Sequence, residues 1–116
     1  MSKPALDMQE KYKAQHNWQD QSRLAWLRYK AQCRFRNEPW ISWKDWQDLW
    51  FDEDIFSRKG RGNRDLVISK ICYDQPYSRT NCCLVQRHHT LRARRYFHFF
   101  NGQACLDHAV IERKLS

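Results

Sequence analysis

The first third of the chain places its apolar residues at helical intervals. Leu24, Leu27 and Ala31 recur at i, i+3 and i+7, and Trp26, Tyr29 and Cys33 do the same on a neighbouring face, with no glycine or proline in between. This period predicts an amphipathic helix over about residues 10–33. The residues before it, 1–8, carry no such pattern, and we expect them to form a flexible tail.

A second helix is expected over residues 42–51. Ser42 is the candidate N-cap, and an acidic residue follows it three positions later, as in a variant of the capping box. Trp43, Trp46 and Trp50 then recur at i, i+3 and i+7. Aromatic side chains at this spacing form a core far more often than a platform on which nucleic-acid bases stack. We therefore expect the three indoles to belong to the core.

Three consecutive acids, Asp52, Glu53 and Asp54, follow the tryptophans. Negative charge at the C-terminal end of a helix opposes the helix dipole. The run therefore predicts that the second helix frays at its end. The alternative interpretation of the same three side chains is a carboxylate site for a metal ion.

The second half of the chain alternates short apolar runs with turn residues. A loop is expected over residues 57–63, which hold two of the three glycines and three basic side chains. Strands are expected over residues 66–72 and 82–85, and a basic helix over residues 87–100. A short terminal helix over about residues 103–115 is expected to cap the core.

Together these elements predict an α+β fold, a mostly helical small domain built around a ββα hairpin at about residues 66–100. A chain of 116 residues rarely divides into two cores, so one domain is expected over residues 9–116. The mean hydropathy is −0.95. No apolar run is long enough for a membrane span, and the start lacks the apolar core of a secretion signal. We therefore expect a cytoplasmic protein with no membrane partner.

The five cysteines form no CxxC pair. In a reducing compartment we expect them to be free thiols, several of them buried as small apolar residues. The alternative is a zinc site that combines Cys72, Cys82 or Cys83 with His88 or His89. Structural zinc sites usually show closely spaced ligand pairs, which this sequence lacks.

The positive charge of the chain is concentrated in one segment. Residues 58–95 hold ten basic and two acidic side chains, a net of +8, and the remaining residues hold eleven of each sign. So localised a field attracts polyanions and speeds encounter with them. The alternative, a solvated basic face, usually interleaves acids among the bases. The segment therefore predicts a nucleic-acid partner, or a protein that imitates or shares the surface of one.

Five short motifs, in this order, resemble the small HNH-type (ββα-metal) endonuclease-like proteins common in phages. They are WISWKDWQDLW, RKGRG, LVISK, DQPYSRTN and the start of the basic helix. In that family, a helix with spaced tryptophans precedes an RGR-like loop, a strand with a basic residue and a turn that ends in asparagine. The resemblance covers about residues 24–95. The matching positions are Ser42, Trp46, Trp50, Arg58, Gly60, Arg61, Lys70, Pro76, Tyr77, Ser78 and Asn81.

The resemblance implies a definite mechanism. Nucleases of this family hold one divalent ion between an acid or histidine of the first strand and a histidine of the helix, and the ion stabilises negative charge on the phosphate. A neighbouring histidine acts as the general base. On this chain, Asn81 matches the asparagine that fixes the hairpin. His89, eight residues later, matches the helix ligand, with His88 as the alternate. The candidate metals are Mg²⁺, Mn²⁺, Ni²⁺ and Zn²⁺.

The first strand departs from the family pattern. Ser69 and Lys70 occupy the positions of the ligand and the base, yet serine is a weak ligand and a lysine amine is ordinarily protonated near neutral pH. Asp74 is the candidate to supply a carboxylate if the turn folds back. The candidate catalytic residues are therefore Asn81, His89 and Lys70. The candidate metal ligands are His89, His88 and Asp74, and weak or absent cleavage is expected.

Three functions remain open. The first is a phage-type HNH-like DNA-binding protein in the host cytoplasm, either a metal-dependent endonuclease of the homing type or a catalytically impaired relative. The second is a small phage inhibitor, an anti-defence or host-takeover protein that uses the basic ββα scaffold to block a host nucleic-acid-processing enzyme. The third, an RNA-binding module, rests on charge alone. The residues expected at a nucleic-acid interface are Arg58, Lys59, Arg61, Arg64, Arg79, Arg87, Arg92, Arg94 and Arg95.

Overall fold

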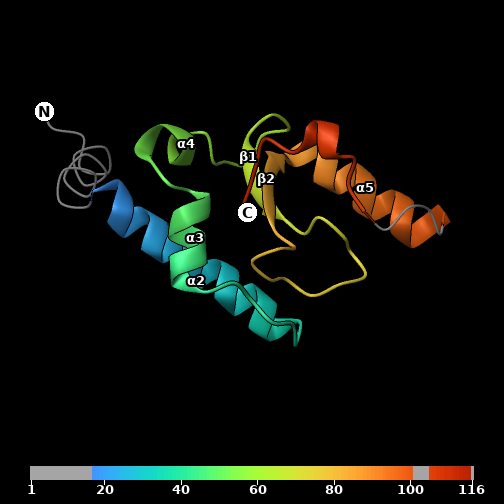
Figure 1. Cartoon of the computed structure of the whole chain (residues 1–116), viewed down its shortest axis with the longest axis horizontal. Coiled ribbons are helices and arrows are strands. Elements are labelled where there is room, and N and C mark those ends of the chain that lie inside the picture. The colour runs from blue at the N-terminus through green and yellow to red at the C-terminus, as the bar shows by residue number, and fades with distance from the viewer. Residues whose placement is uncertain (1–16, 101–104, 116) are drawn as a thin grey trace, which may run out of the picture.

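The computed structural model describes residues 17–100 and 105–115 and has the expected α+β organisation. Within these residues, three helices precede an antiparallel strand pair, a fourth helix follows it, and a short last strand joins the sheet (Figure 1). The elements are α2 (Trp18–Phe35), α3 (Trp43–Leu49), α4 (Glu53–Ser57), β1 (Leu66–Ser69), β2 (Cys83–Gln86), α5 (Arg87–Phe100), the 3₁₀ turn η1 (His108–Val110) and β3 (Arg113–Lys114). Among the described residues, no helix is long and apolar enough to span a membrane.

The three strands form one antiparallel sheet with β2 in the middle and β1 at an edge. Leu66 pairs with Gln86 at one end of the β1–β2 ladder, and Ser69 pairs with Cys83 at the other. Successive side chains of a strand point to opposite faces. Leu84 therefore joins the core that contains the tryptophans of α2 and α3, whereas its neighbour Cys83 joins a second core beside α5 and the terminal segment. The sheet is thus the middle layer of the molecule.

Trp26 of α2 and Trp46 of α3 are buried in the core, as their spacing predicts, whereas Leu24 and Leu27 on the neighbouring face of α2 are exposed. Trp46 is completely buried, and its Nε1 donates to the hydroxyl oxygen of buried Ser22 at 2.9 Å. Trp26 Nε1 donates to the carbonyl oxygen of Ile41 at 3.0 Å, and the Tyr29 hydroxyl accepts from the Ile41 N–H at 3.0 Å. These bonds fasten α3 and the segment before it to α2.

The acidic run begins a helix rather than fraying one. α3 ends at Leu49, and the Asp52 carboxylate accepts a hydrogen bond from the Ile55 N–H at 2.8 Å as the N-cap of α4. Acidic side chains at a helix N-terminus are favoured by the dipole and by the free N–H groups there. The prediction of fraying is therefore wrong.

The predicted terminal helix is also wrong, within residues 105–115. This segment makes one 3₁₀ turn and a short strand that pairs with β2. Pairing satisfies backbone groups along the open side of β2, whereas an isolated helix of this length is marginal. Leu106 and Leu115 are buried near the two ends of the segment and belong to different cores. The predictions for residues 1–16 and 101–104 lie outside the described residues.

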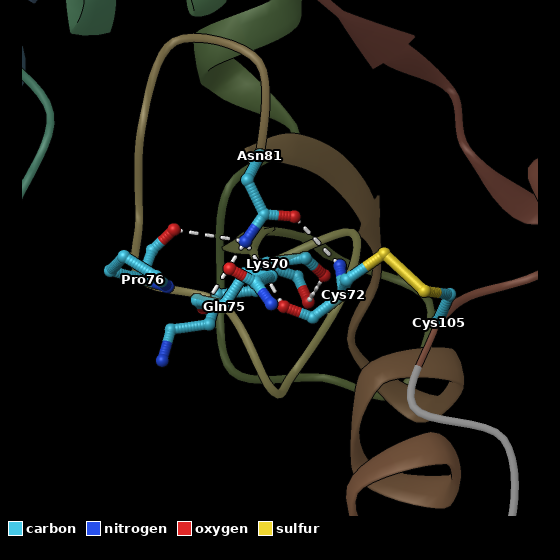
Figure 2. Close-up of a disulfide and its surroundings, with 7 residues drawn as sticks. Lys70, Cys72, Gln75, Pro76, Asn81 and Cys105 are labelled. Carbon is cyan, nitrogen blue, oxygen red and sulfur yellow. Dashed lines mark hydrogen bonds between the residues drawn. A yellow bond between two sulfur atoms is a disulfide. The ribbon is translucent and has the colours of Figure 1, made fainter.

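Two of the five cysteines form a disulfide, contrary to the expectation of free thiols. Cys72, shortly after β1, is bonded to Cys105 of the terminal segment (Figure 2). Cys33, Cys82 and Cys83 are free and buried, as expected for thiols that act as small apolar residues. Burial raises the pKa of the Cys82 thiol to about 11 and that of Cys83 to about 12. These two thiols are therefore poor nucleophiles and poor metal ligands near neutral pH.

Candidate nucleic-acid interface

A strongly basic groove is lined by α2, β1, the loop at residues 59–61 and the first turns of α5. Its volume is about 670 Å³. Glu38 is the one acidic side chain among the described residues that line it. Such an excess of positive charge in a concave surface attracts anions. The seven cationic side chains in the lining are Arg28, Arg36, Lys59, Arg61, Lys70, Arg87 and Arg94.

Two pairs of arginines reach this basic groove from α2 and α5. Arg28 lies on α2 and Arg36 is the C-cap of that helix, whereas Arg87 and Arg94 are seven residues apart on α5. Residues seven apart share one face of a helix. Each helix, with the cap residue of α2 included, therefore contributes two guanidinium groups, and such groups bind phosphate oxygens in a bidentate geometry.

The loop between α4 and β1 supplies Lys59 and Arg61. The Asp65 carboxylate closes this loop by accepting a hydrogen bond from the Gly62 N–H at 2.8 Å. A Cβ atom at Gly60 would overlap the same carboxylate. Position 60 therefore requires glycine for this close approach, and the tight loop holds its two cations at the groove.

Lys59 lies near two other cations of the groove, Arg28 and Arg61. Neighbouring protein atoms desolvate its amine and lower its pKa, and the charges of Arg28 and Arg61 lower that pKa further. An anion bound among the three groups would be attracted by all of them and would offset their mutual repulsion. The local electrostatics therefore favour a negatively charged ligand.

Three hydroxyl groups meet in the groove where β1 approaches α5. Ser69 Oγ and Thr90 Oγ1 are 2.7 Å apart, and the Tyr73 hydroxyl is 2.7 Å from Thr90 Oγ1. Ser69 and Thr90 are buried. Because hydroxyl groups both donate and accept, this network joins the strand to the helix without charge. Ser69 occupies the position where the HNH resemblance implies a metal ligand, and its partners are hydroxyl groups and a backbone carbonyl.

Lys70 lines the groove but is engaged in an ion pair. Its Nζ lies 3.0 Å from the Glu38 carboxylate and 5.4 Å from the ring centroid of Tyr77. The Lys70 side chain is 14% exposed. These contacts join the end of β1 to the segment after α2, so the structure gives Lys70 a positioning role.

The two predicted histidines do not line the groove. The rings of His88 and His89 are in contact, tilted by 39° with centroids 3.9 Å apart, and His88 Nε2 is 2.8 Å from the Gln86 side-chain oxygen. His89 lines a second cavity, of about 310 Å³, together with Arg92. Burial lowers the pKa of His89, and the charges of His88 and Arg92 add to the effect. Of the candidate catalytic residues, Lys70 and His89 therefore line different cavities.

Asn81 fastens the long loop between β1 and β2. Its side-chain oxygen accepts from the Cys72 N–H at 2.7 Å. Its amide nitrogen donates to the carbonyl oxygens of Cys72, Gln75 and Pro76 at 3.0, 3.2 and 2.9 Å (Figure 2). All four bonds go to the main chain of the loop that Asn81 itself ends. Asn81 is therefore a loop anchor in this structure.

Asp74 lies beside the disulfide rather than beside the histidines. Its carboxylate and the sulfur atoms of Cys72 and Cys105 lie within 4.8 Å of one another. In the described part of the chain, this is the one group of three or more metal-ligating side chains so close together. The candidate set of His88, His89 and Asp74 is not gathered at one point. The bonded sulfurs are not thiolates in this form and so are not ligands.

Two of the arginines expected at the interface are paired with acids elsewhere in the chain. Arg58 lies 2.7 Å from the Glu112 carboxylate. Arg79 lies 2.6 Å from Asp45 and 3.4 Å from Asp48, both on α3. These two cations hold the terminal segment and the β1–β2 loop in place, and their charge is partly neutralised.

The other expected cations divide between three places, and the groove adds two that the sequence analysis missed. Arg28 and Arg36 lie outside the basic segment 58–95 from which the interface was predicted. Their spacing of eight residues, with Gln32 midway, was the available signal. The structure places Lys59, Arg61, Arg87 and Arg94 in the groove, Arg92 in the second cavity, and Arg64 and Arg95 on the surface outside both.

The composition of the basic groove is what makes it the candidate site. It gathers cations from segments far apart in the sequence around a single paired carboxylate and a network of hydroxyl groups. The resemblance to HNH-type proteins rests on the sequence motifs alone. Comparisons of the chain with known protein families, with curated proteins and with solved structures find no match.

Proposed function

We propose that the chain is a DNA-binding protein of the HNH-like type that holds the sugar-phosphate backbone in the basic groove. One observation carries this proposal. Seven cations line the groove, and its single acid, Glu38, is already paired with one of them, Lys70. Within the described residues, none of the other six cations has an ion pair. Contacts between such cations and phosphates supply most of the affinity of non-specific DNA binding.

The number of unpaired cations sets the expected salt dependence. Each phosphate contact releases counterions and adds about 0.9 to the slope of log affinity against log salt concentration. Six contacts therefore predict a slope of about −5 for duplex DNA. Phosphate contacts carry little sequence information, so the binding that this groove supplies is expected to vary weakly with sequence.

Removing three groove arginines is expected to weaken DNA binding strongly. Arg28, Arg61 and Arg94 come from α2, the loop and α5, and all three are exposed, so glutamine can replace them without disturbing the core. The triple variant is expected to lose about 100-fold in affinity at low salt and to flatten the salt slope by about three. Fluorescence anisotropy with a labelled duplex at several salt concentrations measures both quantities.

A matched control removes the same charge from outside the groove. Arg34, Lys44 and Lys114 are exposed and do not line it. Their triple replacement by glutamine is expected to change affinity by less than about fivefold, since only long-range attraction is lost. Equal losses in the two triple variants would refute the groove as the interface. Tighter binding to structured RNA than to duplex DNA would refute DNA as the partner.

The groove is built for binding more than for cleavage. Its described lining contains no histidine, and its one carboxylate is held by Lys70. Ser69, in the position of a first-strand metal ligand, is buried in hydrogen bonds to other hydroxyls. A ββα-metal mechanism needs an anionic or imidazole ligand at that point. We therefore propose a DNA-binding relative that lacks the metal-dependent step.

Supercoiled plasmid incubated with the protein and Mg²⁺, Mn²⁺, Ni²⁺ or Zn²⁺ is expected to remain supercoiled. Agarose gels over a time course, with a metal-dependent nuclease as the positive control, measure the nicked fraction. Nicking that disappears in His89→Ala but persists in His108→Ala would contradict a purely binding role. His108 is the matched control because it is exposed and lies outside both cavities.

A further inference from the structure

Hydrogen bonds to its backbone hold Cys72 in place independently of its disulfide. Asn81 accepts from the Cys72 N–H at 2.7 Å and donates to the Cys72 carbonyl oxygen at 3.0 Å (Figure 2). The preceding residue, Ile71, is buried and accepts from the Leu106 N–H at 2.7 Å. Both sides of Cys72 are therefore fixed by bonds that do not involve sulfur.

Cys105 is held opposite Cys72 in the same way. The two residues pair as an isolated antiparallel bridge, and the neighbour of Cys105, Leu106, is buried in the core beside α5. Opening the disulfide would leave this backbone pairing in place. The two sulfur atoms would then remain neighbours as free thiols.

Asp74 adds a carboxylate to this pair. Its oxygen lies within 4.8 Å of both sulfur atoms. The side chain is exposed, and within the described residues no hydrogen bond or ion pair involves it. Two sulfurs and an uncommitted carboxylate are thus preorganised at one point, whereas the other three cysteines are buried elsewhere.

We propose that the reduced protein binds one zinc ion through Cys72, Cys105 and Asp74, and that the disulfide is the metal-free form of the same site. Zinc takes thiolate and carboxylate ligands at about 2.3 and 2.1 Å in a tetrahedral arrangement. Two thiolates on one tetrahedral zinc lie about 3.8 Å apart, nearly twice the roughly 2.05 Å of a disulfide bond, so the two cysteine side chains must turn apart after reduction while their backbones stay paired. Water completes the fourth position. The site is distinct from the groove and does not depend on the proposed DNA binding.

The exchange between the two forms is balanced by an external two-electron donor. A cellular dithiol gives two electrons and two protons to the disulfide, which becomes two thiols, while the dithiol becomes a disulfide. Zinc binding then releases the two thiol protons. In vitro, a phosphine supplies the two electrons: it becomes the phosphine oxide with an oxygen atom from water, and the two protons of that water complete the two thiols. The disulfide of the oxidised form and the zinc ion of the reduced form each join Cys72 of the hairpin loop to Cys105 of the terminal segment. The fold therefore keeps a cross-link in both redox states.

Cobalt(II) is the probe for this site, because thiolate ligation gives strong near-ultraviolet bands and tetrahedral geometry gives visible ones. Phosphine-reduced protein is expected to bind one equivalent with both sets of bands, and zinc chloride is expected to displace it. Air-oxidised protein is expected to show neither set. Asp74→Asn is expected to weaken cobalt binding at least tenfold and to change the visible bands, since one anionic ligand becomes neutral.

Two controls keep the result specific to these residues. Cys33→Ala removes a free, buried thiol from outside the group and is expected to bind cobalt as the wild type does. Alkylation in denaturant is expected to label three cysteines without reductant and five with it. Thiolate bands that persist in Cys72→Ser would overturn the site. Five labels without reductant, equal binding by oxidised protein, or no bands in reduced protein would overturn the proposal as stated.

Discussion

Replacing Trp46 by alanine is expected to lower the free energy of unfolding by about 4 kcal/mol. The indole is fully buried where α2 meets α3, with ring centroids 5.3 Å from Tyr29 and 5.8 Å from Trp50. Its Nε1 also donates to buried Ser22, whose hydroxyl would lose that donor. The substitution therefore combines a large cavity with a disrupted buried hydrogen bond. Urea unfolding followed by far-ultraviolet circular dichroism measures the loss.

Trp40→Ala is the matched control for this prediction. Trp40 is 37% exposed, and the Lys30 amine lies over its ring, 5.3 Å from the centroid. Its removal is expected to cost less than about 1 kcal/mol. Trp46→Phe, which keeps a ring but not the N–H, is expected to fall between the two and remains measurable if the alanine variant does not fold. If Trp46→Ala and Trp40→Ala lowered the free energy of unfolding equally, the helical spacing of the tryptophans would not identify the core residues.

Local patterns predicted the elements whose signal lies within a few residues. The basic run at residues 87–100 has no glycine or proline, and it is helical over those same residues. Ser42 caps α3 through the Asp45 N–H, as its position before the tryptophans suggested. In both cases the stabilising bonds connect neighbours in the chain, which is why spacing and composition are sufficient to find them.

The start of α4, the form of the terminal segment and the disulfide depend on contacts between residues distant in the sequence, so local patterns did not predict them. Whether Asp52 ends one helix or begins the next depends on where the chain turns, and the turn is set by packing of α3 on α2. The terminal segment has enough apolar spacing for a helix, but β2 offers it unsatisfied backbone groups. Cys72 and Cys105 are 33 residues apart, and only the folded chain brings them together.

The same limit applies to the candidate site. Charge density along the chain identified Lys59, Arg61, Arg87 and Arg94, because their segment is basic as a whole. It could not identify which cations of that segment meet an acid, since Glu112, the partner of Arg58, lies far along the chain. It also missed Arg28 of α2 and Arg36 at the end of that helix, because the face that a helix turns toward a groove is fixed by what its other faces bury.

Experiments on Asn81 can distinguish the catalytic role that the HNH resemblance implies from the loop-anchoring role that its hydrogen bonds indicate. Asn81→Ala is expected to lower the free energy of unfolding by about 3 kcal/mol, because four main-chain hydrogen bonds lose a partner that is 8% exposed. Asn81→Asp is expected to cost at least as much, since a carboxylate still accepts from the Cys72 N–H but faces three carbonyl oxygens. Asn63→Ala, at an exposed loop position, is the control and is expected to change stability by less than about 0.5 kcal/mol.

The affinity for DNA distinguishes the two roles that Asn81 can have. The bonds of its side chain are to the loop between the strands, and Asn81 does not line the basic groove. At a temperature where Asn81→Ala is still folded, duplex binding is therefore expected to stay within about twofold of the wild type, while the midpoint of urea unfolding falls. A stable Asn81→Ala that had lost DNA binding would show instead that the asparagine acts on the ligand. The HNH-like motif would then mark a working site at the hairpin, and the groove between α2 and α5 would have to be reassigned.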